Sequence, residues 1–314
     1  MLRKANDKMA TIKNITENST LENFINYYLE NIVKNNCAET TYKSYKTKMN
    51  KYVVPLIGMN QLGHLKRTNI TNLIDYLCYQ RTGLSSNSVR QIYRILHKIL
   101  DFAVEIDVID KNISNHVKLP PQEKYKPKIY NASEIEILLQ KAEDSFLYVP
   151  IYIAVKTGLR RSEILALRWK DIDLNNRLIT VGSIDLNRPK SRNSIRTIKF
   201  PESLLGVLTN HKSVQQKDFS KNNIEQTNET LAVCKAVGSP INPTFLSRKF
   251  TKFLVENNLP LIHFHSLRHS FATLAHNNGM PIKYLSKILG HANPATTLDY
   301  YVTIDELSTE FIND

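Results

Sequence analysis

A basic stretch with three prolines divides this chain of 314 residues into two unequal parts. It covers residues 118–131 and reads KLPPQEKYKPKIYN. Proline disfavours helical geometry in the residue before it, so this stretch is expected to be extended. Its lysines suit a strap lying against phosphates, and its composition equally suits a solvated hinge. We therefore expect two domains, residues 19–117 and 132–314, preceded by a flexible N-terminus over residues 1–18.

The first domain is predicted to be a compact module of helices. From Thr20 onward apolar residues recur at spacings of three and four, and Ser19 or Thr20 is suited to cap this first helix. Three further helices are predicted over about 40–53, 71–81 and 86–106. The first of these three is rich in lysine and tyrosine, and the last carries an apolar stripe along one face.

The second domain is predicted to combine helices with a small antiparallel sheet. Asn131 or Ser133 is suited to cap a helix that starts near Glu134, and another helix over about 150–167 is interrupted at a Thr-Gly turn. Residues 178–181 and 193–200 read as strands, the second because apolar and polar residues alternate along it.

Two later segments of this domain have weaker patterns. The stretch 212–228 is polar and lacks periodicity, so it is interpreted as a loop or a weak helix. The tail, residues 304–314, suits a short amphipathic helix. The expected fold class is therefore mainly α with a small antiparallel β-sheet.

The charge of the chain indicates a polyanionic partner. The formal net charge is +13 and the pI is about 9.5. Charge alone also fits a generic basic protein, so it indicates a nucleic-acid partner only together with other signals. Cys37, Cys78 and Cys234 are scattered without metal-ligand spacing, as expected of free thiols in a reducing cytoplasm. No run approaches the ~18 apolar residues of a membrane span, and no secretory signal is evident.

Three segments of the second domain offer side chains suited to phosphate chemistry. Residues 157–163 read TGLRRSE, residues 264–269 read FHSLRH, and Leu289-Gly290-His291 is followed by two tyrosines at positions 300 and 301. Arginine forks and histidine N–H groups suit an anionic, phosphate-like transition state, and tyrosine is a potential nucleophile.

In this order the three segments resemble the tyrosine recombinases, the family of phage and transposon integrases. The resemblance covers nearly the whole chain and implies a helical core-binding domain, a basic linker and an α+β catalytic domain with a C-terminal tail helix. It also implies a site-specific recombinase that cleaves and rejoins DNA through a 3′-phosphotyrosine intermediate, to integrate or excise a mobile element. The implied partners are double-stranded DNA, a homotetramer on paired sites and an accessory DNA-bending or directionality factor, with no cofactor and no metal.

The resemblance assigns roles to seven residues. Arg160 and Arg268 clamp the non-bridging phosphate oxygens, with Glu163 on the same helical face as Arg160 to orient the site. His265 contacts the phosphate or acts as a general base, and His291 hydrogen-bonds a phosphate oxygen.

Two further residues complete the predicted set. Lys190 is the general acid for the leaving 5′-oxygen, in a segment that resembles the Pro-Lys-Thr-x-x-Ser-x-Arg hairpin of the family with Ser191 in place of the usual threonine. Tyr301 is the nucleophile, since it fills the tyrosine slot of the Thr-Thr-Leu-Asp-x-Tyr pattern.

Several alternatives remain open at this level. Arg161 competes with Arg160, Arg192 with Lys190, and Tyr300 with Tyr301, while His269 is interpreted as structural. The tail is expected to dock on a neighbouring protomer or to fold back on its own domain. Two other functions share this residue pattern: a type IB topoisomerase-like relaxing enzyme, and a DNA-binding protein without catalysis.

Overall fold

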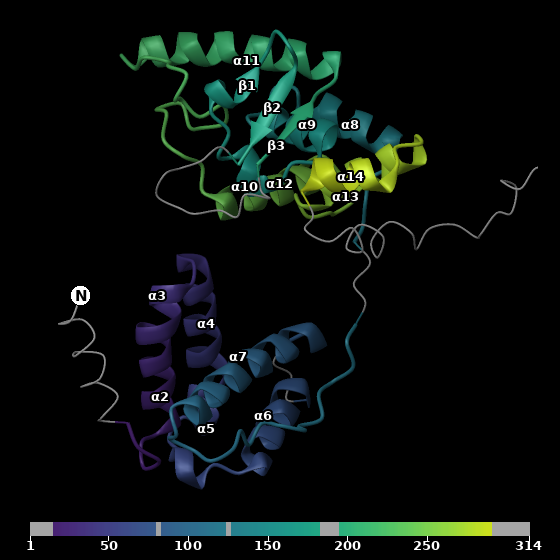
Figure 1. Cartoon of the computed structure of the whole chain (residues 1–314). Coiled ribbons are helices and arrows are strands. Elements are labelled where there is room, and N and C mark those ends of the chain that lie inside the picture. Colours follow the sequence, from purple (N-terminus) through teal and green to yellow (C-terminus); the bar gives the residue numbers. More distant parts are fainter. Residues whose placement is uncertain (1–14, 80–82, 124–126, 183–194, 291–314) are drawn as a thin grey trace, which may run out of the picture. The chain divides into compact units, whose positions relative to one another are not determined.

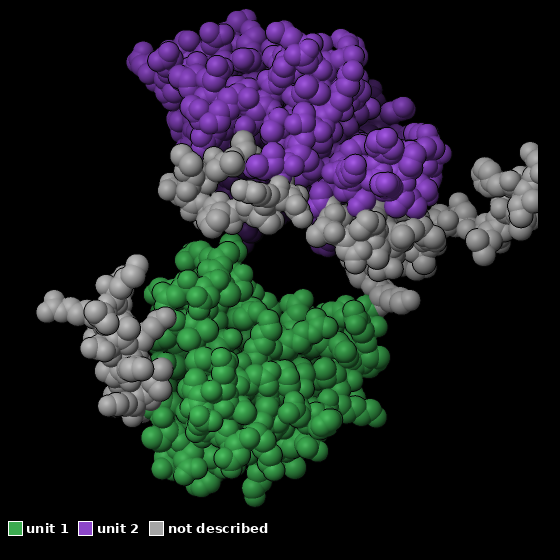
Figure 2. All heavy atoms as spheres, viewed as in Figure 1, with its two compact units in different colours: residues 1–125 green, residues 126–314 purple. Residues whose placement is uncertain are grey.

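The computed structural model describes residues 15–79, 83–123, 127–182 and 195–290 (Figure 1). The chain forms two compact units, Met1–Tyr125 and Lys126–Asp314, which are coloured separately in Figure 2. Helices predominate within the described ranges, and a three-stranded antiparallel sheet lies in the second unit. The predicted fold class is thereby confirmed. None of the described helices has both the length and the apolar character that crossing a lipid bilayer requires.

The first unit consists of helices, as predicted. Helix α2 (Leu21–Tyr28) begins directly after Thr20, whose hydroxyl accepts a backbone N–H of the first turn at 3.3 Å. The segments that follow are a π-helical turn (Leu29–Val33), α3 (Lys34–Asn36), α4 (Glu39–Tyr52), α5 (Val54–Ile57), a 3₁₀ turn (Leu62–His64), α6 (Arg67–Tyr79) and α7 (Ser86–Glu105). Helix α6 begins at Arg67 rather than near Thr71 as predicted.

One face of α7 forms the centre of the core of this unit. The buried side chains on this face are Val89, Ile92, Ile95, Leu96, Ile99, Leu100 and Ala103. They form the apolar stripe that the sequence predicted, and α7 packs with it against α4 and α6. Burial of each leucine or isoleucine contributes about 1.5–3 kcal/mol, so this stripe accounts for much of the stability of the unit.

The described ends of the predicted linker are attached to their own units. On the first unit, Arg90 of α7 donates to the Pro120 carbonyl at 2.5 Å, and the Asn87 amide donates to the Glu123 carbonyl at 3.0 Å. On the second unit, Tyr130 is buried and its hydroxyl donates to a backbone carbonyl at 2.5 Å. The predicted bounds of the linker, residues 118–131, stay a prediction.

The second unit begins with a helix whose start the sequence predicted. The Asn131 side chain accepts the N–H of Glu134 at 2.9 Å, and the Glu134 carboxylate accepts the N–H of Asn131 at 2.8 Å, which forms a capping box. The helices of this unit are α8 (Ala132–Ala142), α9 (Tyr148–Thr157), α10 (Arg161–Ile164), α11 (Glu202–Lys221), α12 (Pro243–Glu256), α13 (Ser266–Asn277) and α14 (Ile282–Leu289).

The sheet of the second unit follows the predicted pattern. Strands β1 (Ile172–Asp173), β2 (Leu178–Val181) and β3 (Arg196–Lys199) are antiparallel in the order β1-β2-β3. Ile179 pairs with Ile198, and both side chains are buried on one face of the sheet. The alternation of apolar and polar residues around β3 therefore corresponds to a half-buried strand, as expected.

Helix α11 refines one prediction. The stretch 212–228 was predicted to be a loop or a weak helix; it is helical up to Lys221, and residues 222–228 are not helical. Gln215 and Phe219 are buried on it, and the Trp169 indole donates to the Gln215 side chain at 2.7 Å. A buried glutamine gives no apolar periodicity in the sequence, so the buried face of the helix was hidden.

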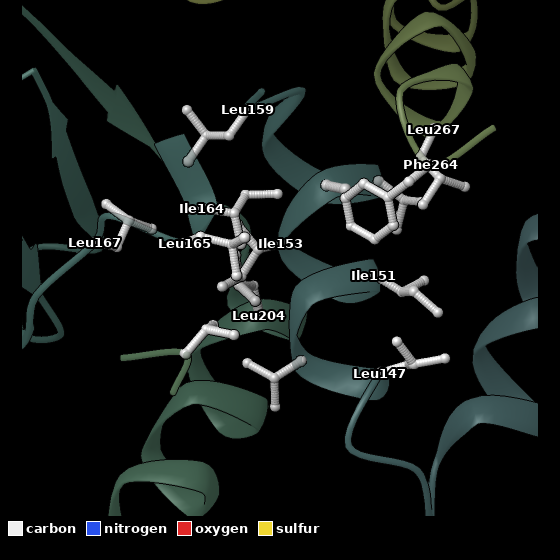
Figure 3. Close-up of a cluster of buried hydrophobic side chains, with 14 of the residues drawn as sticks. Leu147, Ile151, Ile153, Leu159, Ile164, Leu165, Leu167, Leu204, Phe264 and Leu267 are labelled. Atoms are coloured by element: carbon white, nitrogen blue, oxygen red, sulfur yellow. The ribbon is translucent and has the colours of Figure 1, made fainter. Parts of the chain in front are cut away.

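The core of the second unit holds together the segments predicted to carry the site (Figure 3). Leu159 lies in the first arginine motif and Ile164 directly follows it, and Phe264 and Leu267 lie in the second motif. All four side chains are buried in one cluster together with Ile151 of α9. The packing of this cluster therefore fixes the two motifs relative to each other.

Candidate active site

The segment that carries Arg160 turns sharply between two helices. Helix α9 ends at Thr157, and Gly158 adopts the left-handed conformation with a φ of 67°. A Cβ at Gly158 would lie 2.4 Å from Cδ1 of Phe271, so the position requires glycine for its backbone angle and for space. Arg160 follows in extended conformation as the N-cap residue of α10.

Arg268 is a buried charge at the start of α13. Its side chain is 2% exposed. One terminal nitrogen donates to the Gly158 carbonyl at 2.8 Å, and the other donates to the Leu289 carbonyl at 2.7 Å. A guanidinium this deeply buried is stable only when its N–H groups have partners, and these carbonyls supply them. Arg268 therefore links the Thr-Gly turn to the end of α14.

Glu163 is the acidic group around which the arginines gather. Its carboxylate accepts the backbone N–H of Arg160 at 2.8 Å and the Arg160 guanidinium at 2.9 Å. The Arg268 guanidinium lies 4.0 Å away. The prediction that Arg160 and Glu163 share one helical face is wrong, because Arg160 precedes the helix and Glu163 folds back to cap it. The orienting contact predicted for Glu163 is nevertheless present.

The state of the Glu163 carboxylate is set by two opposing effects. Burial alone would raise the pKa of Glu163, but hydrogen bonds from Arg196 and from the Arg160 backbone outweigh burial and hold this pKa below its usual value. The carboxylate is therefore ionised at neutral pH. It faces three guanidinium groups, which leaves this group of four residues with an excess of two positive charges.

His265 lies beside the same arginines, directly before α13. Partial desolvation of its ring, together with the positive charges of Arg268 and Arg160, lowers the pKa of His265 below its usual value. The ring is therefore neutral at neutral pH and carries one N–H donor and one acceptor. The His269 ring stands perpendicular to it, with 5.0 Å between the ring centroids.

The structure thus brings Arg160, His265 and Arg268 together. Arg161, the alternative to Arg160, also lies near His265, but its guanidinium donates to the Ser247 hydroxyl of α12. Arg161 is thus hydrogen-bonded to α12, whereas Arg160 contacts Glu163, the carboxylate that Arg268 also faces.

The other three predicted residues, Lys190, His291 and Tyr301, lie outside the described residues, as do their alternatives Arg192 and Tyr300. The described chain directly before His291 reaches the site. Gly290, which directly precedes His291, accepts a hydrogen bond from the Arg160 guanidinium at 3.1 Å.

Arg196 is a site residue that the sequence prediction did not include. It lies at the start of β3 and donates to both carboxylate oxygens of Glu163, at 3.1 Å and 2.9 Å. Its Nε donates to the Ile288 carbonyl at 2.5 Å. The Ser-x-Arg end of the predicted hairpin contained this residue, but only its contact with Glu163 reveals a place in the site.

No group of three or more His, Cys, Asp or Glu side chains within the described ranges is arranged to hold a metal ion. A mechanism without metal stays a prediction to be tested with chelator.

Comparison with known proteins identifies the class. Residues 125–307 match the phage integrase family, and residues 20–78 match its N-terminal SAM-like domain. The ICEBs1 integrase of Bacillus subtilis (strain 168) is 30% identical over 270 residues, which are 83% of this chain and 73% of that protein. A XerC-like tyrosine recombinase of Caldanaerobacter subterraneus subsp. tengcongensis is 26% identical over 91% of this chain and 79% of its own length.

Solved structures share the fold. The Tn1549 transposon integrase in complex with transposon right end DNA superposes with a TM-score of 0.76, at 22% identity, over 90% of this chain and 94% of that one. The fold and the site thus define a tyrosine recombinase, and the chain belongs to the phage integrase family. Its activity is site-specific breakage and rejoining of DNA strands.

Proposed function

We propose that Arg160, His265 and Arg268 bind the scissile phosphate of a DNA strand. The observation that carries this proposal is the excess of positive charge where three guanidinium groups meet the single carboxylate of Glu163. A phosphodiester approaching its transition state gains negative charge on the non-bridging oxygens, which bidentate arginines stabilise more strongly than lysines do. The neutral His265 ring can donate one further hydrogen bond or accept a proton.

The chemical step follows from this arrangement and from the family motifs. The Tyr301 oxygen attacks the phosphorus and passes its proton to a base, a role for which the neutral His265 ring is suited, and the bond from phosphorus to the 5′-oxygen breaks. Lys190 donates a proton to that leaving oxygen, and His291 donates a hydrogen bond to a non-bridging oxygen. The phosphotyrosine link keeps the energy of the broken bond, so a 5′-hydroxyl can reverse the step and rejoin a strand without ATP or metal.

The first unit offers a basic helix for duplex DNA. Helix α4 carries four lysines and one glutamate. Lys43 and Lys51 are exposed, and Lys46 and Lys48 are half-buried along the same helix. Lysine side chains suit the phosphate backbone, whose neutralisation gives affinity that falls with salt. Transposon DNA is also the ligand in the structure of the Tn1549 integrase.

The biological setting is proposed from the relatives. The ICEBs1 integrase and the Tn1549 integrase carry the names of mobile elements, which supports integration or excision of such an element by this chain. We place the reaction in the cytoplasm, in a homotetramer on paired sites, with an accessory DNA-bending or directionality factor.

The experiment uses nicked suicide duplexes that trap the covalent intermediate. The parent chain is expected to form a protein–DNA adduct, and Tyr301→Phe should form none while still binding the site. Tyr300→Phe is the matched control and should form the adduct. Loss of the adduct in Tyr300→Phe and its persistence in Tyr301→Phe would show that the neighbouring tyrosine is the nucleophile.

A further inference from the structure

Three successive carbonyls at the end of α14 each accept a hydrogen bond from a different arginine. The pairs are Arg196 with Ile288 at 2.5 Å, Arg268 with Leu289 at 2.7 Å, and Arg160 with Gly290 at 3.1 Å. The last carbonyls of a helix lack partners within the helix and carry partial negative charge. The three arginines, which come from β3, α13 and the N-cap of α10, therefore meet directly before His291.

Arg196 differs from the other two arginines in how it uses its donors. Its side chain is 11% exposed, against 36% for Arg160. It contacts both oxygens of Glu163, whereas the Arg160 guanidinium reaches one of them through a single nitrogen. A bidentate pair is stronger and more directional than a single contact. Glu163 is therefore chiefly the partner of Arg196.

We propose that Arg196 is a positioning residue that keeps Glu163 and the end of α14 in place, so that Arg160 is free to bind the scissile phosphate. Without Arg196, the Glu163 carboxylate would have Arg160 as its main partner. Arg160 would then form the bidentate pair itself and would present fewer of its five N–H groups to phosphate. This inference rests on the proposed phosphate-binding role of Arg160.

Gly290 gives independent support, because the local backbone is shaped around Arg196. Its φ is 65°, and a Cβ on Gly290 would lie 2.8 Å from Nη1 of Arg196. The residue before His291 therefore leaves space for this guanidinium as well as ending α14. Arg196 also connects the turn at Gly290 to β3, the strand that follows the segment carrying Lys190 in the sequence.

A positioning role for Arg196 differs from a purely structural ion pair in one measurable respect. If Arg196 only stabilised the fold, removing the charge of Glu163 as well would change the adduct rate only in step with the thermal melting temperature. If Arg196 keeps Glu163 from capturing Arg160, removing the charge of Glu163 should release Arg160 and restore part of the activity. The two substitutions should therefore be strongly non-additive.

The experiment measures the single-turnover rate of adduct formation on saturating suicide duplex, with DNA affinity and thermal melting recorded alongside. Arg196→Gln should slow the adduct by about 100-fold, the effect of misplacing a group by about 1 Å. Adding Glu163→Gln should restore about 10-fold or more of that loss. Arg177→Gln is the matched control: it breaks the exposed Arg177–Glu202 pair beside β2 and should leave the rate unchanged.

Arg196→Lys provides a second route, because it keeps the charge but loses the fork. Its rate should lie between those of the parent and Arg196→Gln, and Glu163→Gln should again raise it, so the test stands even if Arg196→Gln does not fold. A double variant as slow as Arg196→Gln, or slower, would overturn the inference, as would a normal rate in Arg196→Gln. A parent chain that forms no adduct would overturn the proposed function itself.

Discussion

Replacing Gly158 by alanine tests how tightly the site segments are packed, because α9, α13 and α14 meet at this residue. Its carbonyl accepts a hydrogen bond from the Arg268 guanidinium at 2.8 Å. A Cβ would lie 2.4 Å from Phe271 of α13 and 2.9 Å from Leu289 of α14. The methyl group should therefore push apart the elements that hold Arg268.

Two terms set the expected loss of stability. An alanine in the left-handed conformation costs roughly 1–2 kcal/mol, and forcing a methyl into a packed core costs roughly 1–3 kcal/mol more. Gly158→Ala should thus lose about 2–5 kcal/mol. Gly279, in the same unit, has a φ of 85°, and a methyl group added there would meet no atom within 4 Å, so Gly279→Ala should lose only the first term.

The assay is thermal or urea unfolding of both variants, followed through the transition of the second unit, together with the rate of adduct formation. The difference between the two variants isolates the packing term, since the effect of alanine on the unfolded chain is common to both. Gly158→Ala should also slow adduct formation, and Gly279→Ala should not. Equal stability losses in the two variants would refute the packing argument.

Three further predictions concern the chemistry. Arg160→Lys keeps the charge but loses the fork, so adduct formation should fall by ~10²-fold while DNA affinity changes little; Arg161→Lys is the control, and a normal rate in Arg160→Lys would contradict the clamp. The ring of His265 should titrate below its reference pKa of 6.5 in an NMR titration without DNA. Arg160→Gln should raise that pKa because it removes a neighbouring positive charge. A midpoint above 6.5 in the parent would contradict this expectation. Lys190→Ala should form the adduct very slowly on an ordinary phosphodiester but recover on a 5′-bridging phosphorothiolate, whose thiolate leaves without an acid. Arg192→Ala should show no such rescue. A Lys190→Ala variant that is slow on both substrates would contradict the general-acid role.

Much of the fold is readable from local patterns. The stripe on α7 repeats at helical spacing and is buried as predicted, and Asn131 and Thr20 start their helices because a cap depends only on residues within one turn. The family motifs likewise placed Arg160, His265 and Arg268, which the structure brings together.

The remainder depends on contacts between residues far apart in the chain. Arg196 reaches Glu163 across 33 residues and Ile288 across 92 residues, so nothing near Arg196 in the sequence identifies its partners. Gln215 meets Trp169 across 46 residues, which is why α11 continues through a stretch that looks polar and aperiodic. Long-range hydrogen bonds of this kind override local preference.

We expect a tyrosine of this chain to become covalently linked to DNA without a metal ion. The most direct measurement is to trap the adduct on a suicide duplex in EDTA, digest protein and DNA, and identify the modified peptide by mass spectrometry. We expect a 3′-phosphonucleotide on Tyr301. Strict dependence on added magnesium, or a modified peptide in which no tyrosine carries the nucleotide, would contradict the claim.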